Sequence, residues 1–269
     1  MEFRSIEWHK QIANMIDAIG SSAFPDVIID VINQVVPYNQ IVIICYHKGK
    51  APSFWHSKVP EVRKKAVLDQ YLNGCYLLDP WFHAAQRNLP QGLYLLQDIA
   101  PDDFFVSEFY REYYQAIKIQ NEAVFAVKLT DDIQIQISMG LMEDEVSEHT
   151  YNNLLAVSPV IFSAAYKHWS KTLNLDSEVS QRAAIIHEHV SHTFKTFGNP
   201  VLTDREREVA LLIIRGYSFK AIAELLDVAF GTVKVHCKNL YKKLDINSQS
   251  ELFSLFIDAV NFLEIDVEK

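Results

Sequence analysis

The apolar positions of the first 170 residues repeat with two different periods. Residues 2–19 and 25–36 carry apolar side chains three and four positions apart, the spacing of a helix that buries one face. Residues 40–47 form a β-branched run, and a Lys48-Gly49-Lys50 turn separates this run from residues 53–56. The combination predicts a β-hairpin directly after the two helices.

The same mixture of helical and strand patterns continues to residue 173. Residues 122–129 and 133–141 alternate between apolar and polar around Asp131 and Asp132, which predicts a second hairpin. The other expected elements are a short strand over residues 92–98 and helices over residues 60–72, 80–88, 103–117 and 147–173. This order predicts an α+β domain of the sensor type, with helices flanking an antiparallel sheet.

A break at residues 173–177 separates this region from a further helical pattern that runs to residue 197. Apolar or small residues recur there with the spacing of a heptad seam: Val179, Ala183, Ile186, Val190, Thr193 and Phe197. The seam either packs on the sensor or dimerises through Val179, Ile186 and Val190. Gly198-Asn199-Pro200 ends the helix, so we expect a sensor over 1–173, a linker helix over 174–199 and a second domain over 200–269.

The last quarter of the chain contains four short helical patterns with clear start signals. Thr203 to Glu206 and Ser248 to Glu251 are capping boxes, and Ser218 stands at an N-cap position. The third pattern faces a core with residues at spacings of 4, 3 and 4: Val233, Cys237, Leu240 and Leu244. A short helix, a tight turn and this longer helix predict an all-α, four-helix domain with a helix-turn-helix.

The distribution of charged residues along the chain bears on DNA binding more than the net charge does. The net charge of -9 argues against DNA binding, but residues 228–243 hold four lysines and no acidic residue. Lys234, Lys238 and Lys242 lie at i, i+4 and i+8 on the face opposite the core. Such a stripe can bind phosphates and guanine edges, and Val235 can contact a thymine methyl. A solvated helix face is the alternative when the stripe is considered alone.

The residues around the stripe resemble the LuxR-type (NarL/FixJ-like) DNA-binding domain over about residues 200–262. The matching segments are Leu202-Thr203-x-Arg205-Glu206-x-Glu208-Val209, Ile222-Ala223, Thr232-Val233-Lys234-Val235-His236 and Asn239-Leu240-x-x-Lys243-Leu244. The resemblance implies a bacterial transcription regulator that binds a double-stranded operator as a homodimer. It implies base contacts for Lys234, Val235 and Lys238, and phosphate or scaffold roles for Thr232, Asn239, Lys242, Lys243, Ser218 and Lys220. It also implies a dimer contact on the fourth helix, for which we expect exposed Leu252, Leu255 and Phe256.

Three residues depart from the pattern of that family. Ala229 replaces the usual serine cap of the recognition helix, a loss of typically ~1 kcal/mol of local stability. Asp227 replaces a glycine at a left-handed position, which Asp tolerates better than most residues. Gln249 replaces a common arginine, so one phosphate contact is in doubt.

The N-terminal sensor has features of a small-molecule site. It lacks the early acidic cluster and the βα repetition of a phosphoreceiver domain, which excludes that class. Leu78-Asp79-Pro80-Trp81 resembles part of the autoinducer-binding domain, but the aromatic pair of that family would fall on Ala66 and Gln70. The partial resemblance supports a PAS- or GAF-like α-β-α fold more than that particular ligand.

Aromatic side chains with polar tips are the expected ligand contacts. We expect an apolar pocket with a few polar groups, formed by Asp79, Trp55, Tyr71, Trp81, Tyr94 and Tyr76. Asp79 either accepts a hydrogen bond from a ligand amide or amine or caps the helix that begins at Pro80. The alternative function for this domain is a docking site for a protein partner, with the aromatic residues of 104–114 as the docking face.

The remaining features exclude other classes. Cys45, Cys75 and Cys237 lie far apart, which is typical of a reducing compartment, and no apolar run approaches the ~20 residues of a membrane span. We therefore expect a cytoplasmic protein. His189 and His192 share a helix face with no cysteine nearby, so we expect a solvated face and no metal. No phosphate loop, nucleophile elbow or hydrolase metal motif is present, so we expect no enzyme activity and no cofactor.

Overall fold

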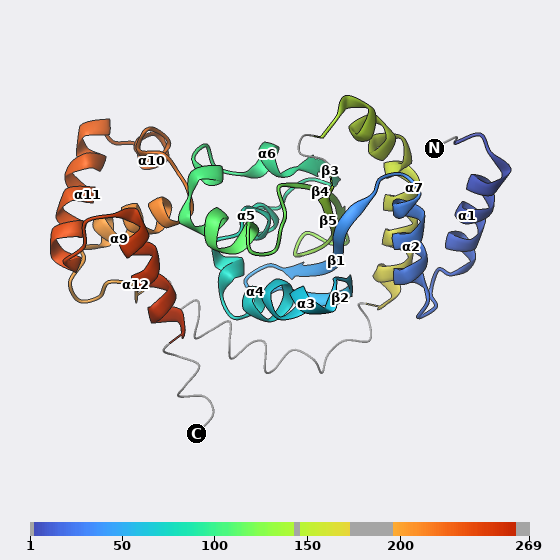
Figure 1. Ribbon diagram of the computed structural model, residues 1–269, viewed down its shortest axis with the longest axis horizontal. Coiled ribbons are helices and arrows are strands. Elements are labelled where there is room, and N and C mark those ends of the chain that lie inside the picture. The colour runs from blue at the N-terminus through green and yellow to red at the C-terminus, as the bar shows by residue number, and fades with distance from the viewer. Residues whose placement is uncertain (1–2, 143–145, 173–195, 262–269) are drawn as a thin grey trace, which may run out of the picture.

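The computed structural model describes residues 3–142, 146–172 and 196–261. An α+β body comprises the N-terminal part of the chain, and a group of four helices lies at one end of it (Figure 1). The predicted linker helix, including Val179, Ile186, Val190 and the histidines, lies outside the described residues. Within the described part, no helix is long and apolar enough to cross a membrane.

A five-stranded antiparallel sheet forms the centre of the sensor. Its strands are β1 (Tyr38–His47), β2 (Ser53–Lys58), β3 (Gly92–Leu95), β4 (Asn121–Lys128) and β5 (Ile133–Leu141), in the order β2-β1-β5-β4-β3. Both predicted hairpins are present. Strand β5 is central, so both of its faces are buried even though its residues alternate between apolar and polar.

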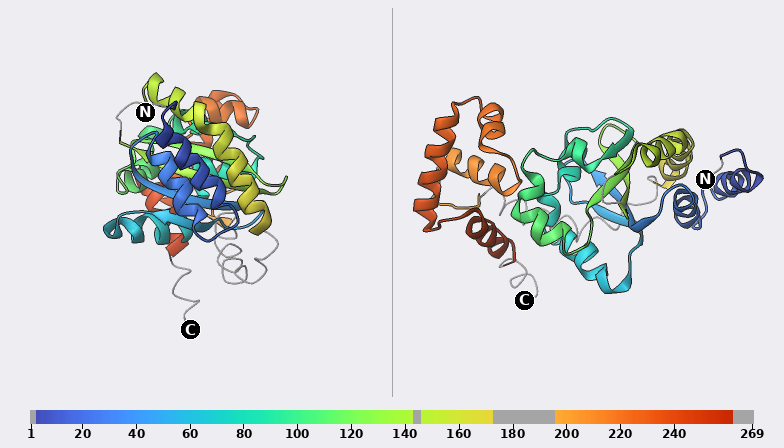
Figure 2. Two further views of the ribbon diagram at one scale, coloured as in Figure 1. Left: turned by 90° about the vertical axis from the view of Figure 1, so that its right-hand side faces the viewer. Right: turned by 45° about the horizontal axis from the view of Figure 1, so that its top comes forward.

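One face of the sheet is covered by three helices and is mostly apolar, with ion pairs from His56 and Lys58 of β2 to Asp26 and Asp30 at its edge. These helices are α1 (Ile6–Asp17), α2 (Phe24–Asn33) and α7 (Glu148–Thr172), and the three lie together beside the sheet (Figure 2). Ile135, Ile137 and Met139 of β5 are fully buried against them, in a cluster that also contains Ile28 and Ile161. Burial of this apolar area supplies the main stabilisation of the sensor.

The other face is covered by short and irregular helices. They are α3 (Glu61–Lys64), a π-helical segment Lys65–Asp69, α4 (Gln70–Leu72), α5 (Pro80–Gln86) and α6 (Leu96–Ile99). The expected strand over 92–98 ends at Leu95, where α6 begins with the Asp98 carboxylate accepting from the Leu95 backbone N–H.

The expected continuous helix over 103–117 is broken, and the sequence interpretation was wrong on this point. A 3-10 turn Phe104–Val106 ends at Ser107, whose hydroxyl donates to the Phe104 carbonyl and accepts from the Tyr110 N–H. A π-helical segment, Tyr110–Tyr114, then follows. Ser107 satisfies backbone groups locally in place of the helical ladder, which explains the interruption.

The C-terminal domain has the four predicted helices. They are α9 (Asp204–Ile214), α10 (Phe219–Leu225), α11 (Phe230–Leu244) and α12 (Gln249–Asn261). Thr203 and Glu206 form the predicted capping box, and Ser218 caps α10 by accepting from the Ala221 N–H. Asp227 adopts the left-handed conformation with φ of 51°, as the sequence suggested. Val233, Cys237 and Leu240 face the core of this domain.

Candidate ligand pocket and nucleic-acid interface

A cavity of about 40 Å³ lies between the sheet and its irregular helical cover. Val42, Ile44 and Tyr46 of β1 form one wall together with the polar side chains of β4 and β5. The opposite wall is aromatic and comes from Tyr71 of α4, Trp81 of α5 and the π-helical segment after Ser107. The complete lining is Gln40, Val42, Ile44, Tyr46, Phe54, Val67, Tyr71, Asp79, Trp81, Tyr113, Tyr114, Ile117, Ile119, Glu122, Gln136 and Ser138.

Asp79 occupies the entrance to α5 and accepts three hydrogen bonds. Its Oδ1 accepts from the Trp81 N–H at 3.1 Å, so the carboxylate caps the helix that begins at Pro80. The hydroxyls of Tyr71 and Tyr114 donate to its two oxygens at 2.6 and 3.1 Å. Asp79 therefore both caps the helix and lines the cavity, so the two roles that the sequence left open are compatible.

Glu122 on β4 is a second buried carboxyl group in the same cavity. The Trp81 indole N–H donates to its Oε2 at 2.6 Å, Tyr114 donates at 3.2 Å, and the Ser138 hydroxyl donates to Oε1. Burial, and to a smaller extent the neighbouring Asp79, raises the pKa of Glu122 to about 7. Burial also raises the pKa of Asp79 to about 6 in spite of its hydrogen bonds. No Lys, Arg or His is among the described residues that line the cavity.

Three of the six predicted ligand contacts line this cavity and three do not. Asp79, Tyr71 and Trp81 line it. Trp55 packs near Trp169 on the other face of the sheet, with ring centroids 6.3 Å apart. The Tyr94 hydroxyl donates to the Pro90 carbonyl at 3.1 Å near the surface, and Tyr76 is buried behind the cavity against Phe82. These three lie outside the cavity, because aromatic content alone does not indicate where in the fold a side chain packs.

The sequence interpretation missed Tyr46, Glu122, Ser138 and Gln40, and included Tyr113 and Tyr114 only in the alternative docking face. A signal for the polar members was present in β5, where Gln134, Gln136 and Ser138 alternate with isoleucines. On a central strand both faces are buried, so polar residues on one face require partners and indicate a site. Recognising this signal required knowing that β5 is central, which follows from long-range pairing.

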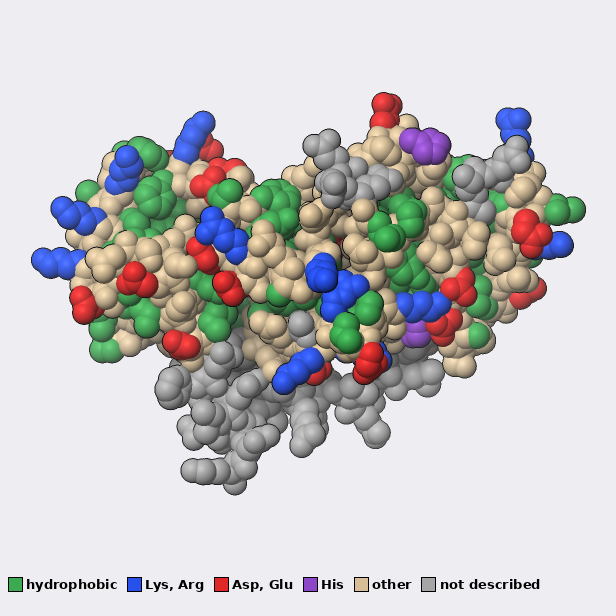
Figure 3. Space-filling model, viewed as in Figure 1, with side chains coloured by type: hydrophobic (Ala, Val, Ile, Leu, Met, Phe, Trp, Pro, Cys, Tyr) green, Lys and Arg blue, Asp and Glu red, His purple; other side chains and the backbone are tan. Residues whose placement is uncertain are grey.

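Helix α11 carries the predicted DNA-contacting residues on its solvent face. Lys234, Lys238 and Val235 are exposed, Val235 by 57%. Thr232, Asn239 and Lys242 are also exposed, and Lys234 lies over the Phe230 ring at 4.6 Å. Lys and Arg side chains project from the edge of the molecule where α11 lies (Figure 3). The solvent face of α11 is therefore accessible and could enter the groove of a nucleic acid.

Two further predicted contacts already have protein partners, while Lys220 on α10 is exposed. The Lys243 ammonium binds Glu206 at 2.6 Å, which joins α11 to α9 and favours the scaffold role. Ser218 binds Asp102 of the sensor: its hydroxyl donates to Oδ2 at 2.5 Å and its N–H donates to Oδ1 at 3.0 Å. At α11, Ala229 has no side-chain cap, as the sequence predicted.

Asp102 belongs to a direct contact between the sensor and the DNA-binding domain. The Asp103 N–H donates to the Gly216 carbonyl at 3.0 Å. A Cβ on Gly216 would lie 2.8 Å from the Phe104 backbone, so only glycine permits this approach. Burial, and to a smaller extent the positive charge of Arg215 in the other domain, lowers the pKa of His83 on α5 to about 3.

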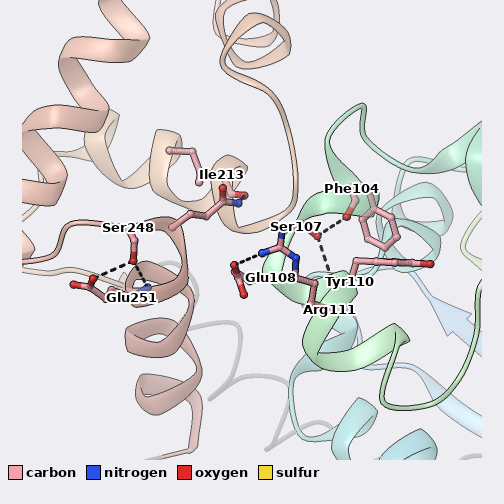
Figure 4. Close-up of polar contacts among 9 residues, drawn as sticks. Phe104, Ser107, Glu108, Tyr110, Arg111, Ile213, Ser248 and Glu251 are labelled. Atoms are coloured by element: carbon pink, nitrogen blue, oxygen red, sulfur yellow. Dashed lines mark hydrogen bonds and ion pairs between the residues drawn. The ribbon is translucent and has the colours of Figure 1, made fainter.

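The aromatic segment on the sensor side of this contact faces the C-terminal domain. In Figure 4, Phe104 to Arg111 lie opposite Ile213, Ser248 and Glu251. Gln249, which replaces the expected arginine, donates to the Ile213 carbonyl at 3.1 Å within its own domain. Phe104, Phe109, Tyr113 and Tyr114 are buried, so the predicted docking face for a protein partner is mostly occupied by the chain itself.

The exposure predicted for the fourth helix was wrong at two of three positions. Leu252 and Phe256 are buried in the core of the C-terminal domain, Phe256 against Phe197. Leu255 is 38% exposed. The spacing of these residues is that of an inward face, and only Leu255 lies outside it.

No group of three or more potential metal ligands occurs among the described residues. Asp79 and Glu122 instead lie in one continuous hydrogen-bonded network with Tyr46, Tyr71, Tyr114, Trp81 and Ser138. This arrangement can hold a small ligand by hydrogen bonds and aromatic contact.

Comparisons with known proteins agree with both halves of this arrangement. Residues 200–256 match the family described as "Bacterial regulatory proteins, luxR family". The chain is 30% identical over 184 residues to a putative HTH-type transcriptional regulator in the exeN 3'region of Aeromonas salmonicida, covering 67% of this chain and 93% of that protein. It is 43% identical over 61 residues to the transcriptional regulatory protein MctR of Rhizobium johnstonii, 23% of this chain and 28% of that protein. The fold of the VqsR LBD domain from Pseudomonas aeruginosa matches 61% of this chain and 98% of that domain, with a TM-score of 0.54 and 18% identity.

Proposed function

Because the chain belongs to the luxR family of bacterial regulatory proteins, whose members are transcription regulators and not enzymes, we propose that it is a dimeric regulator whose DNA binding is controlled by a small molecule in the sensor cavity. It acts on a double-stranded operator in the cytoplasm. Lys234, Val235 and Lys238 contact base edges, and Thr232, Asn239, Lys242 and Lys220 contact phosphates.

The observation that carries ligand control is the continuity between the cavity and the DNA-binding domain. Tyr113 and Tyr114 line the cavity, and the same segment begins at Asp102, which binds Ser218. A ligand that repositions the aromatic wall acts on this contact through about ten residues of chain. The ligand needs only a different affinity for the two positions of this segment to shift the equilibrium between them.

Dimerisation belongs to the same proposal. A two-fold operator requires two recognition helices at a fixed spacing, roughly one turn of DNA apart. Among the described residues of α12, Leu255 is the exposed large apolar residue available for this contact, and the heptad seam predicted from the sequence over 174–199 is a second candidate. We retain the domain limits 1–173, 174–199 and 200–269 as part of this proposal.

The test is DNA binding as a function of salt, with a duplex selected from random sequence by the wild-type protein. Lys234→Ala combined with Lys238→Ala is expected to weaken binding by ~10- to 100-fold and to reduce the slope of log K against log salt by up to ~2. Lys10→Ala combined with Lys167→Ala changes the net charge equally on exposed residues of the sensor and serves as the control. Unchanged affinity and slope in the α11 variant would refute the proposed interface.

A further inference from the structure

We infer that the ligand of the sensor cavity is a small organic cation with N–H donors, such as a primary ammonium group. The inference rests on the proposed ligand control and specifies its chemistry. It is carried by the distribution of hydrogen-bond donors and acceptors around the cavity.

The hydroxyl and indole protons that face the cavity are already used by the protein. Tyr71 donates its single proton to Asp79, so Tyr46, whose hydroxyl lies 2.8 Å from that of Tyr71, must donate to Tyr71. Trp81 and Ser138 donate to Glu122. The one proton of Tyr114 is shared between Asp79 at 3.1 Å and Glu122 at 3.2 Å.

The cavity also contains hydrogen-bond acceptor positions that no protein donor uses. An ionised carboxylate has about four lone-pair positions. Asp79 and Glu122 each accept three hydrogen bonds, so each retains one position. The Gln40 side chain is only 3% exposed, lines the cavity, and its Oε1 has no hydrogen-bond partner. Three acceptor groups from three elements therefore converge on one space.

Strand register leaves this space open. Gly140 of β5 pairs with Gln40 of β1 on one side and with Glu122 of β4 on the other. A Cβ at Gly140 would lie 3.0 Å from Ile119 and 3.3 Å from Gln40, so a side chain there would crowd the cavity. The absence of a side chain between Gln40 and Glu122 lets a ligand approach both.

Charge and shape favour an organic ammonium over other occupants. Two adjacent buried carboxyl groups with no basic residue in the lining are stabilised by a ligand that brings a positive charge. Phe54, Tyr71, Tyr113 and Trp81 supply aromatic faces, which attract cations. Calcium takes about six to eight oxygen ligands, more than these three acceptor side chains provide. A cavity of about 40 Å³ accommodates a small head group.

The experiment titrates ethylammonium chloride into the full-length protein at pH 7.5 and constant ionic strength, with ethanol as the uncharged isostere. The readout is the indole N–H resonance of Trp81 in protein labelled with ¹⁵N-tryptophan, assigned with Trp81→Phe. We expect a saturable shift with a dissociation constant on the order of 1 mM, the ceiling for three heavy atoms. Trp8, Trp55 and Trp169 belong to the opposite core and are internal controls that should not move.

Glu122→Gln removes one charge with little change in volume and is expected to weaken ethylammonium binding at least 10-fold. Asp79→Asn retains an N-cap residue and is expected to do the same. Glu112→Gln, on an exposed position of the same aromatic segment, is the matched control and should bind like the wild type. Because removal of a buried charge should maintain or raise the melting temperature of the Glu122→Gln protein, a folded variant that fails to bind is the supporting result.

Three outcomes overturn the inference. An equal response to ethanol means a pocket for neutral ligands, no response to either probe means no amine site, and unaltered binding by Glu122→Gln means that the carboxyl pair is irrelevant. None of these outcomes changes the salt-dependent DNA binding that tests the proposed function. Failure of the ammonium-ligand inference can therefore be distinguished from failure of the proposed DNA-binding function.

Discussion

At the scale of single residues, Asp79 and Glu122 place two carboxyl groups side by side in a buried site. Burial opposes ionisation of both, and their hydrogen bonds only partly compensate. The aspartate could be found from the sequence because Asp-Pro at a helix start is a local signal. The glutamate could not, because its importance depends on β4 pairing with β5 and on the layer that covers this face.

Raised carboxyl pKa values make the stability of the protein depend on pH. Glu122 retains its proton up to about pH 7 in the folded state but loses it near its ordinary pKa of 4.5 in the unfolded state. Between these values the folded state binds more protons, so the free energy of unfolding falls as pH rises from about 4.5 to 7 and then levels off. Urea unfolding at pH 5 and pH 8 should show a loss on the order of 2 kcal/mol in the wild type.

The Glu122→Gln protein is the comparison for this pH series. It lacks the titrating group, so it should lose less stability than the wild type between the two pH values. A parallel decline in both proteins would assign the effect to other groups.

At the scale of elements, the helices of the DNA-binding domain differ in how their N-termini are capped. Thr203 and Ser218 cap α9 and α10, whereas α11 begins at Ala229 without a side-chain bond. Of these three helices, the recognition helix α11 is therefore the one whose N-terminus lacks a side-chain cap. Helix existence and type were predictable here because each pattern is local and is bounded by capping residues.

Ala229→Ser should supply the missing cap. The Ala229 backbone already has the extended conformation of an N-cap, with φ of -66° and ψ of 145°. A serine hydroxyl there can accept from a first-turn N–H and should raise the free energy of unfolding by ~1 kcal/mol. Thermal unfolding measures the change, and a melting temperature at or below that of the wild type would show that the start of α11 is already satisfied.

The Asp102–Ser218 contact predicts restraint of DNA binding. Asp102 places a carboxylate on the hydroxyl and N–H of a residue assigned to the DNA interface, where a phosphate would otherwise bind. Asp102→Ala should therefore tighten binding of the ligand-free protein to the selected duplex by several-fold, the range of one charge-assisted hydrogen bond at a partly exposed site.

Fluorescence anisotropy is the measurement for this variant, and Asp103→Ala is its control. Asp103 contributes only its backbone N–H to the contact, which alanine retains. Equal affinities for the two variants would mean that the carboxylate of Asp102 does not restrain binding.

At the scale of the whole molecule, the sensor and the DNA-binding domain share one apolar cluster. It joins Phe104 and Phe109 of the sensor to Ile213 and Ile214 of α9. The two-domain organisation and the antiparallel sheet were predictable from hydrophobic periods and turn residues. The contact between the domains was not, because it depends on a broken helix at Ser107 and on Gly216, neither of which has a distinctive local pattern.

Assembly of two copies is testable at this scale. Leu255→Glu on α12 should shift the protein towards monomer in analytical ultracentrifugation, because it places a charge on the apolar contact proposed for the dimer. Val62→Glu, at a position that is 93% exposed on the sensor, is the matched control. Identical sedimentation of both variants and the wild type would move the dimer contact away from α12.

The close approach of Gly216 to Phe104 also limits how freely the halves of such regulators can be exchanged. The similarity to MctR covers 61 residues, which are 23% of this chain and 28% of that protein, so most of each chain lies outside the match. A chimera that joins this sensor to a foreign DNA-binding domain at residue 200 should fold in both halves. It should nevertheless lose its response to the effector unless the graft carries a glycine at position 216 and a hydroxyl at position 218, because those two residues form the joint through which the sensor is connected.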